Sequence, residues 1–320
     1  HGPAWQNSLF EDNAEFGFGM ALGQKAVRGR LAEYVNEIAA KTDDEAMKKA
    51  CAEYIDTFND SGANRVAADA LIAELEKASA YDCEVGQLAK KTLADKDFLA
   101  KKSMWIFGGD GWAYDIGFGG LDHVIASGEN VNILVFDTEV YSNTGGQASK
   151  ATPVGSVAQF AAAGKATKKK DLAGIAMSYG YVYVAQVAMG ADYNQCIKAF
   201  TEAESYNGPS IIIAYAPCIN HGIKGGMGIS QAEEKKAVAA GYWNNFRFDP
   251  RKADNGENPF TLDSKAPTGD YQAFLKGENR YASLAKVNPE RAAELFAKAE
   301  KNSKDEYDHL KKLVTLYAGK

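Results

Sequence analysis

Two stretches decide the fold expected of this 320-residue chain: SMWIFGGDG, from Ser103 to Gly111, and NVNILVFDTEVYSNTGGQ, from Asn130 to Gln147. Each begins with a short apolar run bounded by glycine or polar residues, which is typical of a buried strand. From residue 103 to about residue 243, further apolar runs alternate with helical patterns. Strands separated by helices indicate right-handed crossovers and a parallel sheet. The sequence therefore predicts an α/β fold, with a mostly parallel sheet flanked by helices.

Asp110 and Thr138 directly follow the first two of these expected strands. Open α/β sheets bind ligands at the carboxyl ends of their strands, so this carboxylate and this hydroxyl could converge on one cation. Magnesium prefers such hard oxygen ligands and usually shares them with substrate phosphates, which the backbone at Gly109 and Gly111 could approach closely. A plain turn is the alternative reading of Gly-Asp-Gly. A dinucleotide fingerprint is disfavoured, because Tyr114 stands where a third glycine or alanine is needed.

Composition limits the possible classes of protein. With 46% hydrophobic residues the chain can bury a full core, and no run approaches the length of uncharged apolar sequence that spans a bilayer. The N-terminus lacks the basic and apolar regions of a signal peptide, and the start without Met suggests a piece of a longer protein. The net charge of −6 argues against a nucleic-acid partner. Four cysteines without a CxxC pair fit a reducing cytoplasm.

The chain is expected to have three regions. Residues 1–102 form an N-terminal segment and a helical layer, because apolar residues recur there at three- and four-residue steps. Residues 103–245 form the α/β core, and residues 246–320 form a helical extension that packs against another domain or subunit. The helices expected in the last two regions are one after Tyr114, Val157–Ala166, Leu172–Ser178, Tyr193–Ser205, one after Ser230, Pro289–Lys301 and Lys304–Tyr317.

The two motifs resemble the magnesium-diphosphate motif of thiamine diphosphate (TPP) enzymes, which begins with Gly-Asp-Gly and ends in a polar metal ligand. The stretches Asn143–Pro153, Tyr179–Asp192 and Tyr215–Ile223 are similar to the C-terminal TPP-binding domain of the pyruvate:ferredoxin (flavodoxin) oxidoreductases. This similarity extends from Gly2–Met20 to about Pro250. One departure from the wider TPP pattern is Thr138 in place of an amide ligand, as expected in this group. The resemblance implies the diphosphate-binding half of the TPP fold in the α/β core.

The resemblance also implies the site residues. Mg²⁺ would be held by Asp110, Thr138 and the Val140 carbonyl, and would neutralise the diphosphate. TPP would contact Gly109, Asp110, Gly111, Thr138, Val140 and Asn143. Beside the thiazolium ring, the Asn143 amide could donate to a developing oxyanion, although capping of the next segment is the plainer reading.

Cys218 follows an expected strand, and a cysteine there is by default a small buried apolar residue. The resemblance implies that it is instead the last of four thiolates holding a 4Fe-4S cluster, the one nearest the TPP. Cys51, Cys83 and Cys196 do not match the other three ligand positions, which are expected before His1.

Two further features keep alternative readings. His221 is expected to be a hydrogen-bonded structural histidine, with a ligand or acid-base role as the alternative. The run Lys168–Lys170 is expected to be a solvated loop. Docking of an anionic partner such as coenzyme A or ferredoxin is the alternative for these lysines.

The activity implied by the resemblance is oxidative decarboxylation of pyruvate with coenzyme A to acetyl-CoA and CO2, with ferredoxin or flavodoxin as electron acceptor. The implied assembly is a cytoplasmic homodimer containing the remaining domains of the enzyme. One of those domains supplies the glutamate that activates the aminopyrimidine, so the fragment alone should be inactive. Alternatives are a non-redox TPP-dependent decarboxylase or synthase, which would have no use for a cluster ligand at Cys218, and an inactive cofactor-binding module. The sequence does not specify which 2-oxo acid is used or where coenzyme A binds.

Overall fold

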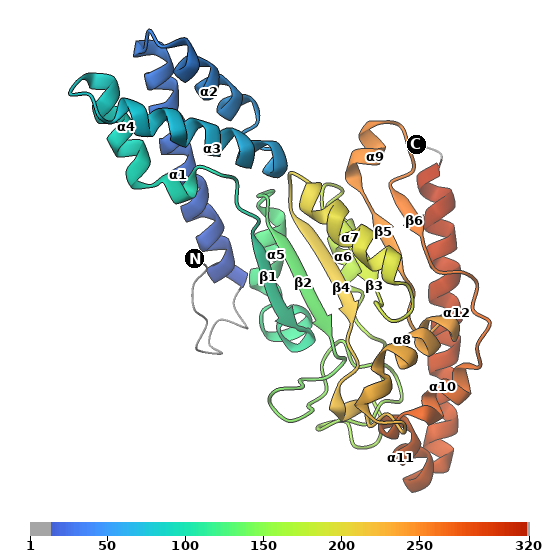
Figure 1. Ribbon diagram of the computed structural model, residues 1–320. Coiled ribbons are helices and arrows are strands. Elements are labelled where there is room, and N and C mark those ends of the chain that lie inside the picture. Colours follow the sequence, from blue (N-terminus) through green and yellow to red (C-terminus); the bar gives the residue numbers. More distant parts are fainter. Residues whose placement is uncertain (1–13, 319–320) are drawn as a thin grey trace. The chain divides into compact units, whose positions relative to one another are not determined.

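The computed structural model describes residues 14–318 and divides into two compact units (Figure 1). One unit is helical and comprises Gly17–Met104; the other contains the α/β fold and begins its main part at Trp105. Most of the Gly2–Met20 segment that contributed to the family resemblance lies outside the described residues. Within residues 14–318, no helix has both the length and the apolar character needed to cross a membrane.

The helical unit confirms the helical periodicity read from the sequence. Its core is built from Leu31, Val35, Tyr54 and Leu71, all fully buried, and from their apolar neighbours. The helices of this unit are α1 (Ala14–Lys41), α2 (Glu45–Asp56), α3 (Ser61–Ala78) and α4 (Glu84–Ala94), where α1 begins just before the unit. The side chains of Asp44 and Asp60 cap α2 and α3 by accepting from Ala46 N and Ala63 N.

The sheet of the second unit is mostly parallel, as predicted. Its strand order is β1-β2-β4-β3-β5-β6, with the first four strands parallel and the last two antiparallel. The strands are β1 (Trp105–Gly109), β2 (Asn132–Asp137), β3 (Tyr183–Val187), β4 (Ser210–Tyr215), β5 (Phe246–Phe248) and β6 (Phe260–Leu262). Gly109 is opposite Phe136, and Asp137 is opposite Tyr215. The residues that follow β1, β2 and β4 therefore meet at one edge of the sheet.

Helices connect and cover the parallel strands. A π-helical turn (Gly111–Ile116) follows β1 at once. The other helices of this part are α5 (Phe118–Ala126), α6 (Leu172–Met177), α7 (Tyr193–Ser205) and α8 (Ser230–Ala239). Helix α7 packs on the sheet through Cys196, Ala199 and Ala203, which share an apolar cluster with Tyr183 and Ile212.

The helix expected over Val157–Ala166 is absent, and that prediction was wrong. Gln159 N donates to Gly146 O at 2.9 Å, and Ala148 N donates to Gln159 O at 2.9 Å, so this segment pairs with the loop after β2. Its backbone also turns through a left-handed conformation at Phe160, with φ +65°. The segment is thus a support of the loop that carries the second motif.

The C-terminal region also differs from the sequence-based expectation. The polar stretch after residue 245 contributes β5 and β6, and the two helices expected around Asn302 are one continuous helix, α12 (Pro289–Ala318), which runs beside β6 (Figure 1). The helix continues through Ser303, whose hydroxyl donates to Gly241 O of a neighbouring loop at 2.7 Å. The preceding helices are α9 (Pro250–Asp254), α10 (Tyr271–Gly277) and α11 (Asn279–Val287).

Candidate metal and cofactor site

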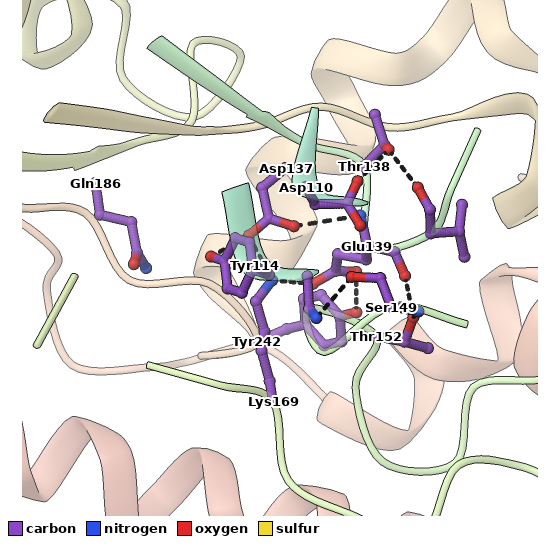
Figure 2. A network of polar contacts seen from close by, with 12 residues as sticks. Asp110, Tyr114, Asp137, Thr138, Glu139, Ser149, Thr152, Lys169, Gln186 and Tyr242 are labelled. Atoms are coloured by element: carbon purple, nitrogen blue, oxygen red, sulfur yellow. Dashed lines mark hydrogen bonds and ion pairs between the residues drawn. The ribbon is translucent and has the colours of Figure 1, made fainter. Parts of the chain in front are cut away.

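Three oxygen atoms from the two motifs converge at the edge of the sheet. The Thr138 hydroxyl oxygen lies 2.7 Å from Asp110 Oδ1 and 3.0 Å from the Val140 carbonyl oxygen (Figure 2). The hydroxyl has one proton and can donate to only one of these acceptors at a time. Asp110 is 1% exposed, and its second oxygen, Oδ2, is buried without a hydrogen-bond partner among the described residues. The cluster therefore holds more acceptors than donors, which fits a hard cation such as Mg²⁺.

The charges around Asp110 also favour a bound cation. Burial, followed by the neighbouring Asp137 carboxylate, raises the pKa of Asp110 to about 7. Both carboxyl groups are almost fully buried, at 1% and 0% exposure. A cation beside Asp110 would stabilise its ionised form. Within residues 14–318, no group of three or more His, Cys, Asp or Glu side chains is arranged to hold a metal ion.

The two glycines of the first motif have different surroundings. A Cβ at Gly109 would meet no atom within 4 Å, so the backbone there borders open space. A Cβ at Gly111 would lie 2.5 Å from the ring of Tyr141. Gly111 is therefore required by packing between the two motifs, whereas Gly109 leaves room for a ligand such as a phosphate.

Asn143 lies at the exposed tip of a tight turn next to the three oxygens. Tyr141 N donates to Gln147 O at 2.9 Å and Gly146 N donates to Tyr141 O at 2.7 Å, which closes the turn. Gly146 has φ +79°, and a Cβ there would lie 3.0 Å from Asn220 Oδ1. The loop after β2 thus rests against the turn that follows β4. The role expected of Asn143 stays a prediction.

Cys218 and His221 lie in the turn that follows β4. The Cys218 thiol is 8% exposed, and its Sγ accepts from Asn220 N at 3.5 Å. His221 is fully buried, and its Nε2 lies 2.7 Å from the Thr138 carbonyl oxygen, which can only accept. Burial, followed by the Arg280 charge, lowers the pKa of His221 to about 3, so the neutral imidazole donates from Nε2. His221 is thus the hydrogen-bonded structural histidine that the sequence favoured. It supports the backbone of the loop after β2 (residues 138–147), which is called the metal loop below because it carries two of the three candidate ligands.

The cysteines of the described residues do not assemble into a cluster site. All four are free thiols. Cys51 belongs to the core of the helical unit, where burial raises its pKa to about 11, and Cys196 lies in the apolar cluster under α7. Cys83 is exposed at the start of α4. Within residues 14–318, Cys218 is the one cysteine in the turn after β4, which contacts the loop after β2 through Asn220 and His221.

A buried network of charged side chains adjoins the metal loop, and the sequence did not predict it (Figure 2). Lys169 Nζ lies 2.7 Å from Asp137 Oδ2 and 3.0 Å from Glu139 Oε1. Arg280 Nη1 lies 2.8 Å from Glu139 Oε2, and the Tyr242 hydroxyl donates to the same oxygen at 2.5 Å. Each of these partners is distant in the chain, and no local pattern marks them.

The charges in this network stabilise one another. Burial opposes the ionised form of Lys169, but Asp137 and Glu139 raise its pKa to about 12. Burial likewise opposes ionised Glu139, but Lys169 and Arg280 lower its pKa to about 2. The expectation of a solvated loop is wrong for Lys169, and also for Lys170, which donates to Tyr114 O at 3.1 Å and lies over the Phe118 ring.

Comparisons with known proteins show which family this chain resembles. Residues 89–214 match the family model described as thiamine pyrophosphate enzyme, C-terminal TPP binding domain. The chain is 56% identical, over 98% of its length, to pyruvate:ferredoxin oxidoreductase of Moorella thermoacetica. The chain is a close homologue of one part of the pyruvate:ferredoxin and pyruvate-flavodoxin oxidoreductases. Pyruvate-flavodoxin oxidoreductase of Klebsiella pneumoniae is 52% identical over 98% of the chain, and the mitochondrial NADP⁺-dependent pyruvate dehydrogenase of Euglena gracilis is 51% identical over 91%.

The resemblance read from the motifs is thereby confirmed. The homologous region is 27% of the Moorella protein, 26% of the Klebsiella protein and 16% of the Euglena protein, so the chain spans about a quarter or less of the length of these relatives. Among solved structures, 2-oxoglutarate:ferredoxin oxidoreductase from Magnetococcus marinus, with 2-oxoglutarate, coenzyme A and succinyl-CoA bound, aligns with 36% of this chain and 40% of its own at 24% identity and a TM-score of 0.34.

Proposed function

We propose that this chain forms the diphosphate- and magnesium-binding part of a longer enzyme that oxidatively decarboxylates pyruvate. The proposed reaction consumes pyruvate and coenzyme A, releases acetyl-CoA and CO2, and passes two electrons singly to ferredoxin or flavodoxin. The observation that carries the proposal is the convergence of Asp110, Thr138 and the Val140 carbonyl on one point. This point lies within the region matched by the TPP-binding family model.

In this proposal the three oxygens hold Mg²⁺, which neutralises the diphosphate of TPP. Bound TPP supplies the carbanion-stabilising chemistry, and the protein positions it. Asp110 contributes the negative charge, while the open backbone at Gly109 admits the phosphates. In this proposal the Asn143 amide, which is exposed in the turn that follows Val140, donates to an oxyanion that develops during the reaction.

We further propose that Cys218 supplies one thiolate to a 4Fe-4S cluster whose other ligands come from the rest of the enzyme. Cys218 lies in the turn after β4, which contacts the loop after β2 through Asn220 and His221, and a cluster bound there would give electrons a route out of the site. The rest of the enzyme would also supply the group that activates the aminopyrimidine, and the assembly would be a cytoplasmic homodimer. A non-redox TPP decarboxylase or synthase is the second candidate, and it has no need for this thiolate.

The test of the metal site is Asp110→Ala in the full-length enzyme. This change removes the only carboxylate among the three proposed ligands, so Mg²⁺-dependent TPP binding should weaken at least about tenfold, which corresponds to roughly 1.4 kcal/mol. Isothermal titration of TPP at fixed Mg²⁺ measures the affinity. An unchanged affinity would contradict the assignment of the site.

A further inference from the structure

Glu139 has an unusual backbone conformation at a critical place. It stands between Thr138 and Val140, which provide two of the three proposed metal ligands, and its φ is +60°. Left-handed backbone is rare for residues other than glycine, and it persists where the surroundings hold it in place. Its presence between two ligand residues therefore requires a physical explanation.

The surroundings of Glu139 fix both its side chain and its backbone. The residue is 1% exposed. Its backbone N–H donates to Asp137 Oδ1 at 3.2 Å, and its carbonyl accepts from the Thr152 hydroxyl at 2.5 Å. Its carboxylate contacts three groups from elsewhere in the chain, namely Lys169 at 3.0 Å, Tyr242 at 2.5 Å and Arg280 at 2.8 Å. These contacts hold the left-handed conformation in place.

The conformation of Glu139 has a direct consequence for the metal ligands. A left-handed residue reverses the local direction of the chain, which brings the Thr138 hydroxyl to 3.0 Å from the Val140 carbonyl oxygen. An extended residue between them would separate these two oxygens. We propose that Glu139 is a positioning residue for the metal site, whose buried carboxylate holds the Thr138 and Val140 oxygens in their binding arrangement. This inference rests on the function proposed above.

Residues outside the parallel strands hold the Glu139 carboxylate in place. Arg280 belongs to α11, and Tyr242 follows α8, so two of the three groups that hold the Glu139 carboxylate come from beyond the parallel strands. Arg280 also pairs with Glu278 at 2.7 Å, and its Nη2 donates to the Tyr242 hydroxyl at 3.0 Å. The region that the sequence suggested as a packing tail thus contributes to the position of the metal loop.

A partly buried ion pair elsewhere in the same unit offers a control with similar partners. Glu202 on α7 accepts from the Tyr183 hydroxyl at 2.8 Å and pairs with Arg247 at 2.7 Å, as Glu139 does with Tyr242 and Arg280. Its close partners lie on β3 and β5, Lys198 of α7 is 3.9 Å away, and within residues 14–318 its carboxylate makes no hydrogen bond or ion pair with the loop after β2. Loss of this carboxylate should destabilise the fold without changing the metal ligands.

The experiment compares Glu139→Gln and Glu202→Gln in the full-length enzyme, by titration of Mg²⁺ in the presence of saturating TPP and by thermal unfolding of the metal-free protein. Glu139→Gln keeps the size of the side chain but removes its charge, so Mg²⁺ should bind at least about fivefold more weakly. The kcat at saturating Mg²⁺ and TPP should stay within about twofold, since the ligands themselves remain. Glu202→Gln should lower the unfolding temperature and leave the Mg²⁺ affinity within about twofold.

Three results would overturn the inference: unchanged Mg²⁺ affinity in Glu139→Gln, equal weakening in Glu202→Gln, or loss of kcat with unchanged affinity. If Glu139→Gln does not fold, Tyr242→Phe removes only the hydroxyl that donates to Glu139, and a weakening of about twofold or more is then the required outcome. The Asp110→Ala variant distinguishes failure of the proposed metal site from failure of the positioning role of Glu139. If Asp110→Ala has no effect, the metal site itself is wrong; if only Glu139→Gln has no effect, the positioning role alone is wrong.

Discussion

His221 donates from Nε2 to the carbonyl oxygen of Thr138 at 2.7 Å, and this contact joins the turn after β4 to the loop after β2. The histidine is fully buried, and its ring lies beside that of Tyr215, with centroids 6.2 Å apart. His221, which is three residues after Cys218, thus supports the backbone of the proposed metal ligand Thr138. The proposed cluster ligand Cys218 and the proposed metal ligand Thr138 therefore lie in two segments that are joined by the hydrogen bond of His221.

Replacement of His221 by Phe should destabilise the protein and disturb the metal loop. The ring is retained, but the buried Thr138 carbonyl loses its donor, which costs about 1–3 kcal/mol of unfolding free energy. Chemical denaturation of the metal-free enzyme measures this loss, and His221→Gln, which keeps an N–H donor, should lose less. Equal stability of His221→Phe and the native protein would contradict the role of this hydrogen bond.

Cys218→Ser should lower the iron content of the full-length enzyme and slow reduction of ferredoxin, because a hydroxyl is a poor substitute for a thiolate ligand. Cys196→Ser is a matched control, since Cys196 and Cys218 are both 8% exposed and Cys196 lies in the apolar cluster under α7. Iron analysis and the rate of ferredoxin reduction measure the outcome. Normal values for both in Cys218→Ser would favour the non-redox alternative.

The parts of the site that the sequence predicted depend on local pattern. Asp110 and Thr138 follow short apolar runs, and the rule that parallel strands bind ligands at their carboxyl ends was sufficient to bring them together. The partners of Lys169 and Arg280 lie far away in the chain, so a single sequence contains no pattern that pairs them. The same limit explains the segment around Phe160, where pairing with a distant loop replaced the expected helix.

Lys165 provides a prediction of pH dependence. Its Nζ donates to Ser149 O at 2.8 Å and to Thr152 O at 2.6 Å, and burial, followed by the Lys169 charge, lowers its pKa from 10.5 to about 8. The folded state therefore binds this proton more weakly than the unfolded state, and the free energy of unfolding should rise as pH increases from about 8 toward 10.5. Lys165→Met should flatten this rise. Denaturation curves between pH 7.5 and about pH 10 compare the two proteins, and parallel pH profiles would contradict the assignment.

The isolated 320-residue chain should fold but show no activity. Each of its two units has its own buried core. In the proposed function, the group that activates the aminopyrimidine and the other cluster thiolates come from the rest of the enzyme. The isolated chain should therefore bind TPP weakly, show no iron–sulfur absorbance and release no CO2 from pyruvate. Release of CO2 by the pure chain with TPP and Mg²⁺ would favour a self-contained decarboxylase.

The isolated chain should also self-associate, because one face of the sheet carries exposed aromatic side chains. Phe107 on β1 is 58% exposed and Phe136 on β2 is 43% exposed, and their ring centroids are 6.3 Å apart. An apolar patch of this kind is typical of a surface that is covered in the complete protein. The double change Phe107→Ser and Phe136→Ser should shift the chain toward monomer in sedimentation velocity, since it removes the two rings and leaves the metal loop intact. A native chain that sediments as a monomer would show that this face does not drive association.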